Sequence, residues 1–227
     1  TITGYRDIED RVYTDWDAAE ITLIEDDRWR ENDQLTQEFQ IQHTINDRIG
    51  YVAGFYYWNE YSATRTFRWT FTEFRTGQLS QQAVFAAQPG FTFTPGNSDN
   101  YVGAETSGQA IFGEVNIGLT DRLDLTVGVR YNDEDIESYN IVPTGVQLPP
   151  LPDTEPVGDV FAGIKQVVGE ENFTSTTPRV SLSYDWRDNL MVYVSYAEGF
   201  GAGGINVNPV LGVVPYGPEE LLNYEIG

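Results

Sequence analysis

The sequence predicts an all-β protein, a transmembrane antiparallel β-barrel segment of about eight strands. Three short turns centred on aspartate separate pairs of alternating segments, at Asn46-Asp47-Arg48, Thr120-Asp121-Arg122 and Arg187-Asp188-Asn189. The links between successive pairs are much longer. Outer-membrane barrels have this asymmetry, with tight periplasmic turns at one end and long extracellular loops at the other.

Side chains alternate in character along the segments that flank these turns. From Arg179 to Trp186 the even positions are apolar or aromatic and the odd positions are polar or charged. After Asp121, a second apolar face contains Leu125, Val127, Val129 and Tyr131. Because successive side chains of a strand point to opposite faces, the pattern predicts one face toward lipid and one toward a water-filled lumen.

A soluble β-sandwich also has alternating strands, so it is the alternative to exclude. Its polar face meets bulk water, and its loops are of similar length at both ends. Here every short turn joins the two strands of a pair, and every long link joins two pairs. Aromatic residues such as Tyr51, Tyr57, Tyr131 and Tyr184 lie near strand ends, as in an interfacial girdle. These features favour the membrane barrel.

The alternation of apolar and polar residues gives approximate boundaries for the strands. Strands are expected at about residues 1–12, 34–46, 49–62, 107–120, 123–139, 173–187, 189–200 and 219–227. The long links then cover 13–33, 63–106, 140–172 and 201–218. Phe67 and Trp69 continue the alternation of the third strand into the second of these links. Inward-facing glycines, including Gly54 and Gly128, would let another backbone approach the wall closely.

Composition excludes several classes of protein. The 227 residues include no cysteine, so neither a disulfide nor a thiolate metal site is possible. Thirteen basic residues against 35 acidic ones give a net charge of −22, which argues against a nucleic-acid partner because phosphates would be repelled. No apolar run reaches the roughly 18 residues that a spanning helix needs.

Residues for catalysis are not evident. His43 is the only histidine, and it shares the outward face near a predicted periplasmic turn, which argues against a catalytic triad or a histidine metal site. The acidic groups Asp15-Trp16-Asp17 and Glu25-Asp26-Asp27 have oxygen ligands for calcium, although a solvated acidic loop is the commoner role. We therefore predict no enzyme activity, no cofactor and no metal site.

Several segments resemble one family. They are residues 177–184 (TPRVSLSY), 189–200 (NLMVYVSYAEGF), 203–206 (GGIN) and 215–227 (PYGPEELLNYEIG), with 2–6, 37–41 and 51–57 upstream. Together they are similar to the barrel of TonB-dependent outer-membrane receptors. The resemblance implies a 22-stranded barrel with an N-terminal plug. Residues 1–227 would then be a partial barrel domain, truncated at both ends and without the plug or the TonB box.

The resemblance also implies a location, partners and a function. The location is the outer membrane of a Gram-negative bacterium, and the partners are the TonB complex through the missing plug, membrane lipid, lipopolysaccharide and a small-molecule nutrient. The function is energised, TonB-dependent uptake of a scarce nutrient, with a ferric siderophore as the default ligand. Alternatives are a passive porin and a secreted acidic glycan-binding β-domain.

Two groups of residues are candidates for a site. Arg65, Arg68 and Arg75 are interleaved with Phe67 and Trp69, a mixture able to hold an anionic, partly aromatic ligand by ion pairing and stacking. Pairing with nearby acids such as Glu73, or contact with lipopolysaccharide phosphates, would also account for it. The family signature contains Glu198, Gly199, Phe200, Gly203, Gly204, Asn206, Pro218 and Glu225. We expect these signature residues to be structural.

Overall fold

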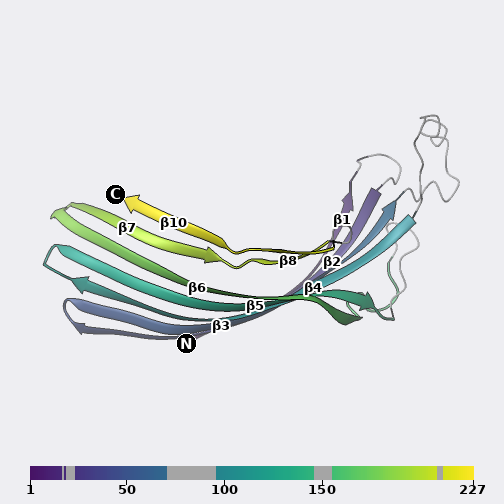
Figure 1. The fold of residues 1–227 in the computed structure, drawn as a ribbon, viewed down its shortest axis with the longest axis horizontal. Helices are drawn as coiled ribbons and strands as arrows, with labels where there is room; N and C mark the ends of the chain where they lie inside the picture. The colour runs from purple at the N-terminus through teal and green to yellow at the C-terminus, as the bar shows by residue number, and fades with distance from the viewer. Residues whose placement is uncertain (17, 19–23, 71–95, 146–154, 209–211) are drawn as a thin grey trace.

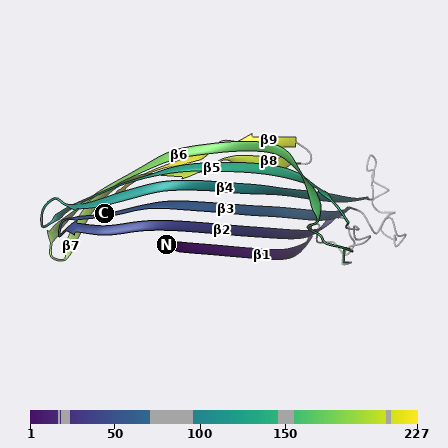
Figure 2. The same cartoon turned by 90° about the horizontal axis from the view of Figure 1, so that it is seen from below.

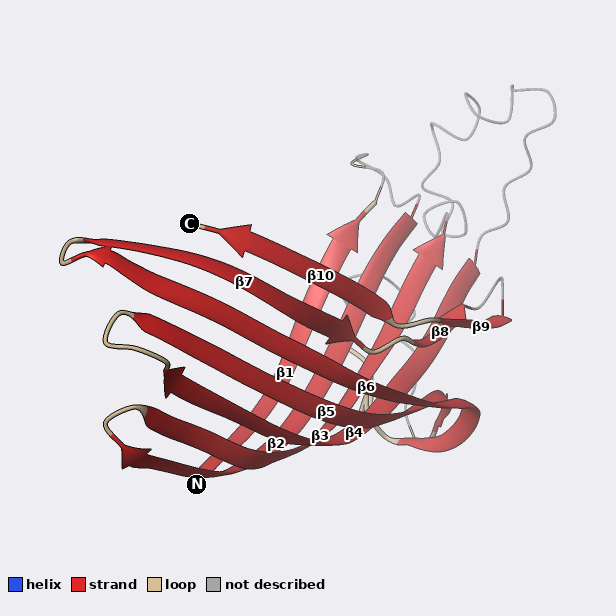
Figure 3. Ribbon diagram, turned by 60° about the vertical axis from the view of Figure 1, so that its left-hand side comes forward, coloured by secondary structure: helices blue, strands red, loops and turns tan. Residues whose placement is uncertain are grey.

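The computed structural model describes residues 1–16, 18, 24–70, 96–145, 155–208 and 212–227. All regular secondary structure in these ranges is β-strand (Figure 3). No helix in the described part of the chain is long and apolar enough to cross a membrane. The predicted all-β class is therefore confirmed.

Eight strands form one antiparallel sheet. They are β1 (Ile2–Asp15), β2 (Ile24–Asn46), β3 (Ile49–Thr70), β4 (Gly96–Gly118), β5 (Leu123–Pro143), β6 (Gly163–Arg187), β7 (Leu190–Gly201) and β10 (Glu219–Ile226). Each strand pairs with its neighbour in chain order up to β7, which pairs with β10. The strands lie side by side in a curved wall (Figures 1 and 2) whose two edges are β1 and β10.

The three predicted turns lie together at one end of this wall, opposite the ends where the longer connections begin (Figure 1). Two of them are stabilised by the residue before the aspartate. Asn46 Oδ1 accepts a hydrogen bond from the backbone N–H of Arg48 at 2.9 Å, and Thr120 Oγ1 accepts one from Arg122 at 3.2 Å. Asn and Thr favour tight turns because their side chains can bond to the backbone two residues on.

The outward face of the wall carries the predicted lipid-facing residues. Phe39, Phe55, Ile111 and Tyr131 lie directly opposite one another across four strands. Ile41 is 68% exposed and Val127 is 42% exposed, although both are apolar. A membrane barrel requires such exposure, because lipid covers this face.

The strands are longer than the alternation predicts. β2 begins at residue 24 instead of 34, β3 ends at 70 instead of 62, and β4 begins at 96 instead of 107. The register continues without a break to Thr70, which pairs with both Ile24 and Gly96. A membrane strand needs only about 9 to 11 residues. Backbone pairing continues beyond this length, and in β3 the alternation continues with it, since Phe67 and Trp69 are buried on the outward face.

The predicted link 201–218 contains a hairpin, which corrects the expectation of a loop. Its strands are β8 (Gly204–Asn208) and β9 (Gly212–Tyr216). Ile205 and Asn206 line a hollow of about 230 Å³ together with Ser62, Thr64 and other residues of the wall. These two wall residues alternate with the outward ones, so the hairpin lies against the inward face.

Two small cores cover the outward face of the extended strands. One contains Ala63, Tyr101, Tyr139 and Ile141, and the other contains Trp29, Phe67 and Trp69. Phe161 packs against both cores and Val160 packs against the second, so residues 155–162 form a strap over this face. Gly158 in the strap has a φ of 108°, a conformation that favours glycine.

Candidate functional site

Arg65 is buried under the strap. Its side chain is 1% exposed and makes a two-point ion pair with Asp99, with Nε–Oδ1 and Nη2–Oδ2 distances of 3.0 and 2.7 Å. Its Nη1 donates a hydrogen bond to the carbonyl oxygen of Val160 at 3.0 Å. The guanidinium also lies 4.7 Å from the ring centre of Phe67. All three nitrogens of the guanidinium are therefore bonded, two to Asp99 of β4 and one to the strap.

The other members of the predicted arginine-aromatic cluster are divided between the two faces. Phe67 and Trp69 are buried on the outward face with Arg65. Arg68 alternates to the inward face, where it is about half exposed and holds Asp26 through two hydrogen bonds of 2.6 and 2.7 Å. Arg75 lies outside the described residues. Both arginines that the structure describes therefore pair with acids, which is one of the alternatives considered from the sequence.

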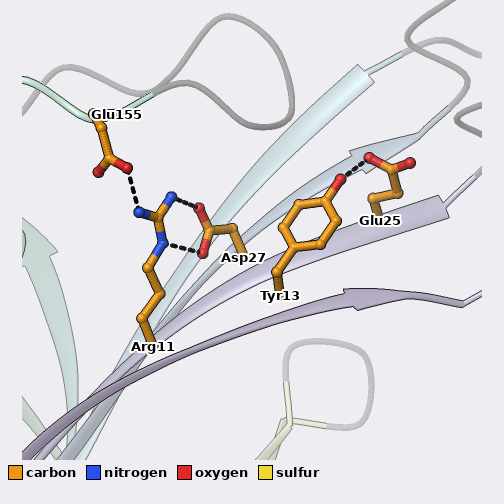
Figure 4. Close-up of polar contacts among 5 residues, drawn as sticks. All are labelled: Arg11, Tyr13, Glu25, Asp27 and Glu155. Atoms are coloured by element: carbon orange, nitrogen blue, oxygen red, sulfur yellow. Dashed lines mark hydrogen bonds and ion pairs between the residues drawn. The ribbon is translucent and has the colours of Figure 1, made fainter.

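Of the acidic residues that suggested calcium, Asp26 and Asp27 pair with arginines, and Asp17 lies outside the described residues. The carboxylate of Asp27 is fully buried and accepts two hydrogen bonds from Arg11, at 2.9 and 2.6 Å. Figure 4 shows Arg11 between Asp27 and Glu155 of the strap, with Tyr13 donating to Glu25 nearby. No group of three or more acidic or histidine side chains suited to a metal is found in the described ranges.

The inward face contains a hollow that combines charge with aromatic surface. Its volume is about 430 Å³. It is lined by Gln34, Tyr56, Trp58, Glu60, Arg130, Asn132, Glu134, Thr177, Gly199 and Phe200. These residues come from β2, β3, β5, β6 and β7, which the sheet order places next to one another apart from the intervening β4. We call it the lumen hollow.

Aromatic rings form the floor of this hollow. The Tyr56 and Trp58 ring centres are 5.5 Å apart with a 31° angle between their planes. A Cβ atom at Gly108 would lie 2.3 Å from the Trp58 ring, and one at Gly54 would lie 2.4 Å from the Phe112 ring. The glycines thus give the rings room to lie on the wall. At Gly54 the close neighbours of such a Cβ would be the Phe112 ring and the backbone carbonyl oxygen of Phe39, at 2.7 Å.

Arg130 is held beside this aromatic floor, which consists of Tyr56 and Trp58, and beside the Phe112 ring, which lies outside the lining of the hollow. Its guanidinium lies 5.5 Å from the Tyr56 ring centre and 5.7 Å from that of Phe112. Its Nε donates to Asn132 Oδ1 at 2.7 Å, and buried Asn132 in turn donates to Ser175 Oγ at 3.0 Å. These contacts fix the orientation of the guanidinium, while Nη1 and Nη2 make no hydrogen bond to any described residue.

The two carboxylates of the lumen hollow differ in their surroundings. Glu60 accepts hydrogen bonds from Asn32 at 2.9 Å and Gln34 at 2.7 Å, and Arg6 lies 3.9 Å away. Glu134 has no ion pair with a residue that the structure describes. The hollow therefore offers one oriented cationic donor, one acceptor outside any ion pair with a described residue, and an aromatic floor, which are groups suited to binding a ligand.

The sequence alone did not predict this hollow, although it contains one indication of it. The alternation already placed Arg130 on the inward face of its strand. What the sequence does not show is which residues of β3 and β4 lie beside it, because the register pairs Phe112 with both Arg130 and Gly54 across strands distant in sequence.

The signature residues have mostly packing contacts. Gly203 and Gly204 are buried, and a Cβ at either would come within 2.5 Å of Tyr216. Glu198 and Glu225 accept hydrogen bonds from Tyr196 and Tyr193, respectively. Asn206 lines the hollow beneath the β8–β9 hairpin, Pro218 directly precedes β10, and Gly199 and Phe200 line the lumen hollow.

Comparison with known proteins relates this chain to outer-membrane receptors. The family model for the TonB-dependent receptor-like β-barrel matches residues 2–227. The pesticin receptors of Yersinia enterocolitica and Yersinia pestis are 29% identical over 134 residues, which is 58% of this chain and 17% of theirs. The chain thus spans about a sixth of the length of these curated relatives.

Solved structures share the fold. The ferric yersiniabactin uptake receptor FyuA of Yersinia pestis has a TM-score of 0.60 at 20% identity, covering 90% of this chain and 27% of its own. The siderophore receptor PiuA of Acinetobacter baumannii has a TM-score of 0.51 at 15% identity, covering 90% and 29%.

The family match accounts for the architecture. Short turns at one end, an apolar outward face and a polar inward face are the features of an outer-membrane barrel wall. Members of this family are receptors in the outer membrane of Gram-negative bacteria, and not enzymes. The match covers nearly the whole chain, so the chain belongs to the TonB-dependent receptor-like β-barrel family.

Proposed function

We propose that the protein containing this chain is an outer-membrane receptor that takes up a ferric siderophore by energised, TonB-dependent transport. The observation that carries the proposal is the family match over residues 2–227. The names of two relatives support the ligand class, since one is a ferric yersiniabactin uptake receptor and another a siderophore receptor. The inward face with its lumen hollow would form part of the path of the ligand.

We also propose that other parts of the protein complete the transporter. The 90% of this chain that aligns with the yersiniabactin receptor covers 27% of that receptor's chain. A plug and a contact with the TonB complex would lie in those other parts, and the rest of the wall would close a 22-stranded barrel. Contacts of the outward face with lipid and lipopolysaccharide belong to the same proposal.

The experiment is an uptake assay with the full-length protein. A strain without its own siderophore receptors, expressing this protein, is supplied with radioactive iron bound to a panel of siderophores. We expect uptake of at least one complex, and its loss when TonB is deleted or the proton-motive force is collapsed, while binding to the cell surface persists. Uptake that continues without TonB would identify a passive porin. Uptake of none of the iron complexes, with TonB-dependent growth on another nutrient, would reject the siderophore.

A further inference from the structure

We propose that the lumen hollow is a subsite for a planar aryl oxyanion, that is, a benzoate, phenolate or catecholate group of the ligand. Arg130 would bind the anionic oxygens, and the aromatic floor would stack on the ring. This inference rests on the proposed function, because it assigns a chemical class to the ligand that passes through the lumen.

Arg130 differs from the other inward-facing arginines that the structure describes because it has no carboxylate in ion-pair contact. The other five described arginines on this face each have a carboxylate within 3.9 Å: Arg6, Arg28, Arg30, Arg68 and Arg179. Arg130 has no such partner in the parts of the chain that the structure describes. A half-buried guanidinium with no acid in ion-pair contact is a favourable site for an anionic ligand, because two of its nitrogens still have donors to use.

The second argument is the geometry that holds Arg130. The hydrogen bond from its Nε to Asn132, and the bond from Asn132 to Ser175, restrict the side chain before any ligand arrives. A pre-oriented guanidinium loses less conformational entropy on binding than a free surface arginine. The Nη1 and Nη2 atoms present parallel donors that match the two oxygens of a carboxylate or catecholate.

The third argument is the aromatic floor beside the guanidinium. Trp58 lies over Gly108, which leaves room for its ring on the wall, and the Tyr56 ring lies 5.5 Å from it at an angle of 31°. A planar ring can stack on such a surface while its oxyanion meets Arg130. A neutral hydroxamate complex without an aryl ring would gain neither the ion pair nor the stacking.

Glu134 provides a hydrogen-bond acceptor at the end of the lumen hollow away from Arg130. It is four residues from Arg130 on the same face of β5, about 13 Å along the strand. No ion pair joins the two, although their charges attract each other, and the carboxylate would accept from a phenolic or amide donor of the ligand. The subsite therefore suits a ligand whose aryl oxyanion lies at Arg130 and whose hydrogen-bond donor lies farther along β5, at Glu134.

The experiment measures binding to the purified full-length receptor in detergent by equilibrium dialysis. The probes are iron-free salicylate, radioactive ferric 2,3-dihydroxybenzoate, and ferrichrome, a trihydroxamate without an aryl ring. The variants are Arg130→Ala, Arg130→Lys and Trp58→Leu. Arg30→Ala is the matched control, since Arg30 is also an inward arginine but pairs with Asp10 and does not line the hollow.

We expect Arg130→Ala to weaken binding of both aryl probes roughly 10- to 100-fold, the usual effect of losing a hydrogen-bonded ion pair. Arg130→Lys should lose less, and Trp58→Leu should lose affinity without changing the salt dependence. Ferrichrome binding should stay within about twofold in all three variants, and Arg30→Ala should bind every probe like the wild type. An unfolding curve in detergent establishes that each variant is folded, and Arg130→Lys replaces Arg130→Ala if the latter is not.

Two outcomes would overturn the subsite. Wild-type affinity of folded Arg130→Ala for both aryl probes would show that the group does not bind them. An equal loss for aryl and hydroxamate complexes, with a lower unfolding midpoint, would assign Arg130 to contact with another part of the receptor. Arg130-dependent salicylate binding in a receptor that transports no iron complex would reject the proposed function and leave the subsite standing.

Discussion

Arg65 and Asp99 form a buried two-point ion pair between β3 and β4, on the outward face where the strap covers the wall. The Arg65 side chain is 1% exposed and that of Asp99 is 15% exposed. Replacing one partner would leave the other charge buried without compensation. The pair therefore connects the stability of the extended strands with the position of residues 155–162.

We expect Asp99→Asn to destabilise the full-length protein by about 3 to 5 kcal/mol, the cost of breaking a buried ion pair. The control is Asp10→Asn, which breaks the Arg30–Asp10 pair, with side chains 47% and 41% exposed. Such a pair contributes at most about 1 kcal/mol. Urea unfolding in detergent measures both. Equal costs for the two variants would mean that the strap does not bury Arg65.

The two faces of β5 are expected to tolerate arginine differently. Val127→Arg places a charge toward lipid and should cost about 2 to 4 kcal/mol near the middle of the bilayer. Thr126→Arg points into the lumen, loses only its bond to Asn116 Oδ1 at 2.7 Å, and should cost about 1 kcal/mol. Unfolding in lipid bilayers compares the two. A larger cost at Thr126 would reverse the assignment of the faces.

Gly54 should not accept even a methyl group. A Cβ there would meet the Phe112 ring at 2.4 Å and the carbonyl oxygen of Phe39 at 2.7 Å, so the rigid backbone as well as the ring must move. We expect Gly54→Ala to cost about 1 to 3 kcal/mol, as other overpacked sites do. Gly113→Ala on β4, whose nearest atom would be 3.7 Å away, is the control. Thermal unfolding that ranks Gly113→Ala as the more harmful would contradict the packing described.

Ligand contact by the predicted arginines stays a prediction with a direct test. Arg65→Gln should lower stability and leave the affinity of the folded receptor unchanged, because Arg65 is buried. Arg68→Gln should weaken binding of an anionic ligand by a few-fold in low salt only, since an exposed charge contributes at most about 1 kcal/mol and is screened. A triple variant combines these two substitutions with Arg75→Gln.

The binding assay across salt concentrations separates the roles of these arginines. A triple variant with wild-type affinity in low salt and a more permeable outer membrane would assign the cluster to lipopolysaccharide.

The sequence by itself determined the β-class, the three turns and the two faces of the wall. These are local properties. A period of two specifies which side chains share a face, and Asn46 and Thr120 stabilise their turns through bonds to a residue two positions on. The outward position of Val127 and the inward position of Arg130 follow from the alternation alone.

Only the tertiary structure decided which of these faces became buried and which stayed open. Arg65 and Arg130 both stand among aromatic residues, yet Arg65 is covered by Val160, 95 residues away, while Arg130 faces the lumen hollow. The alternation reports a side chain's direction but not the segment that packs against it. Burial of Arg65 depends on the strap, and the lumen hollow depends on the register that brings Gly54, Phe112 and Arg130 into one row.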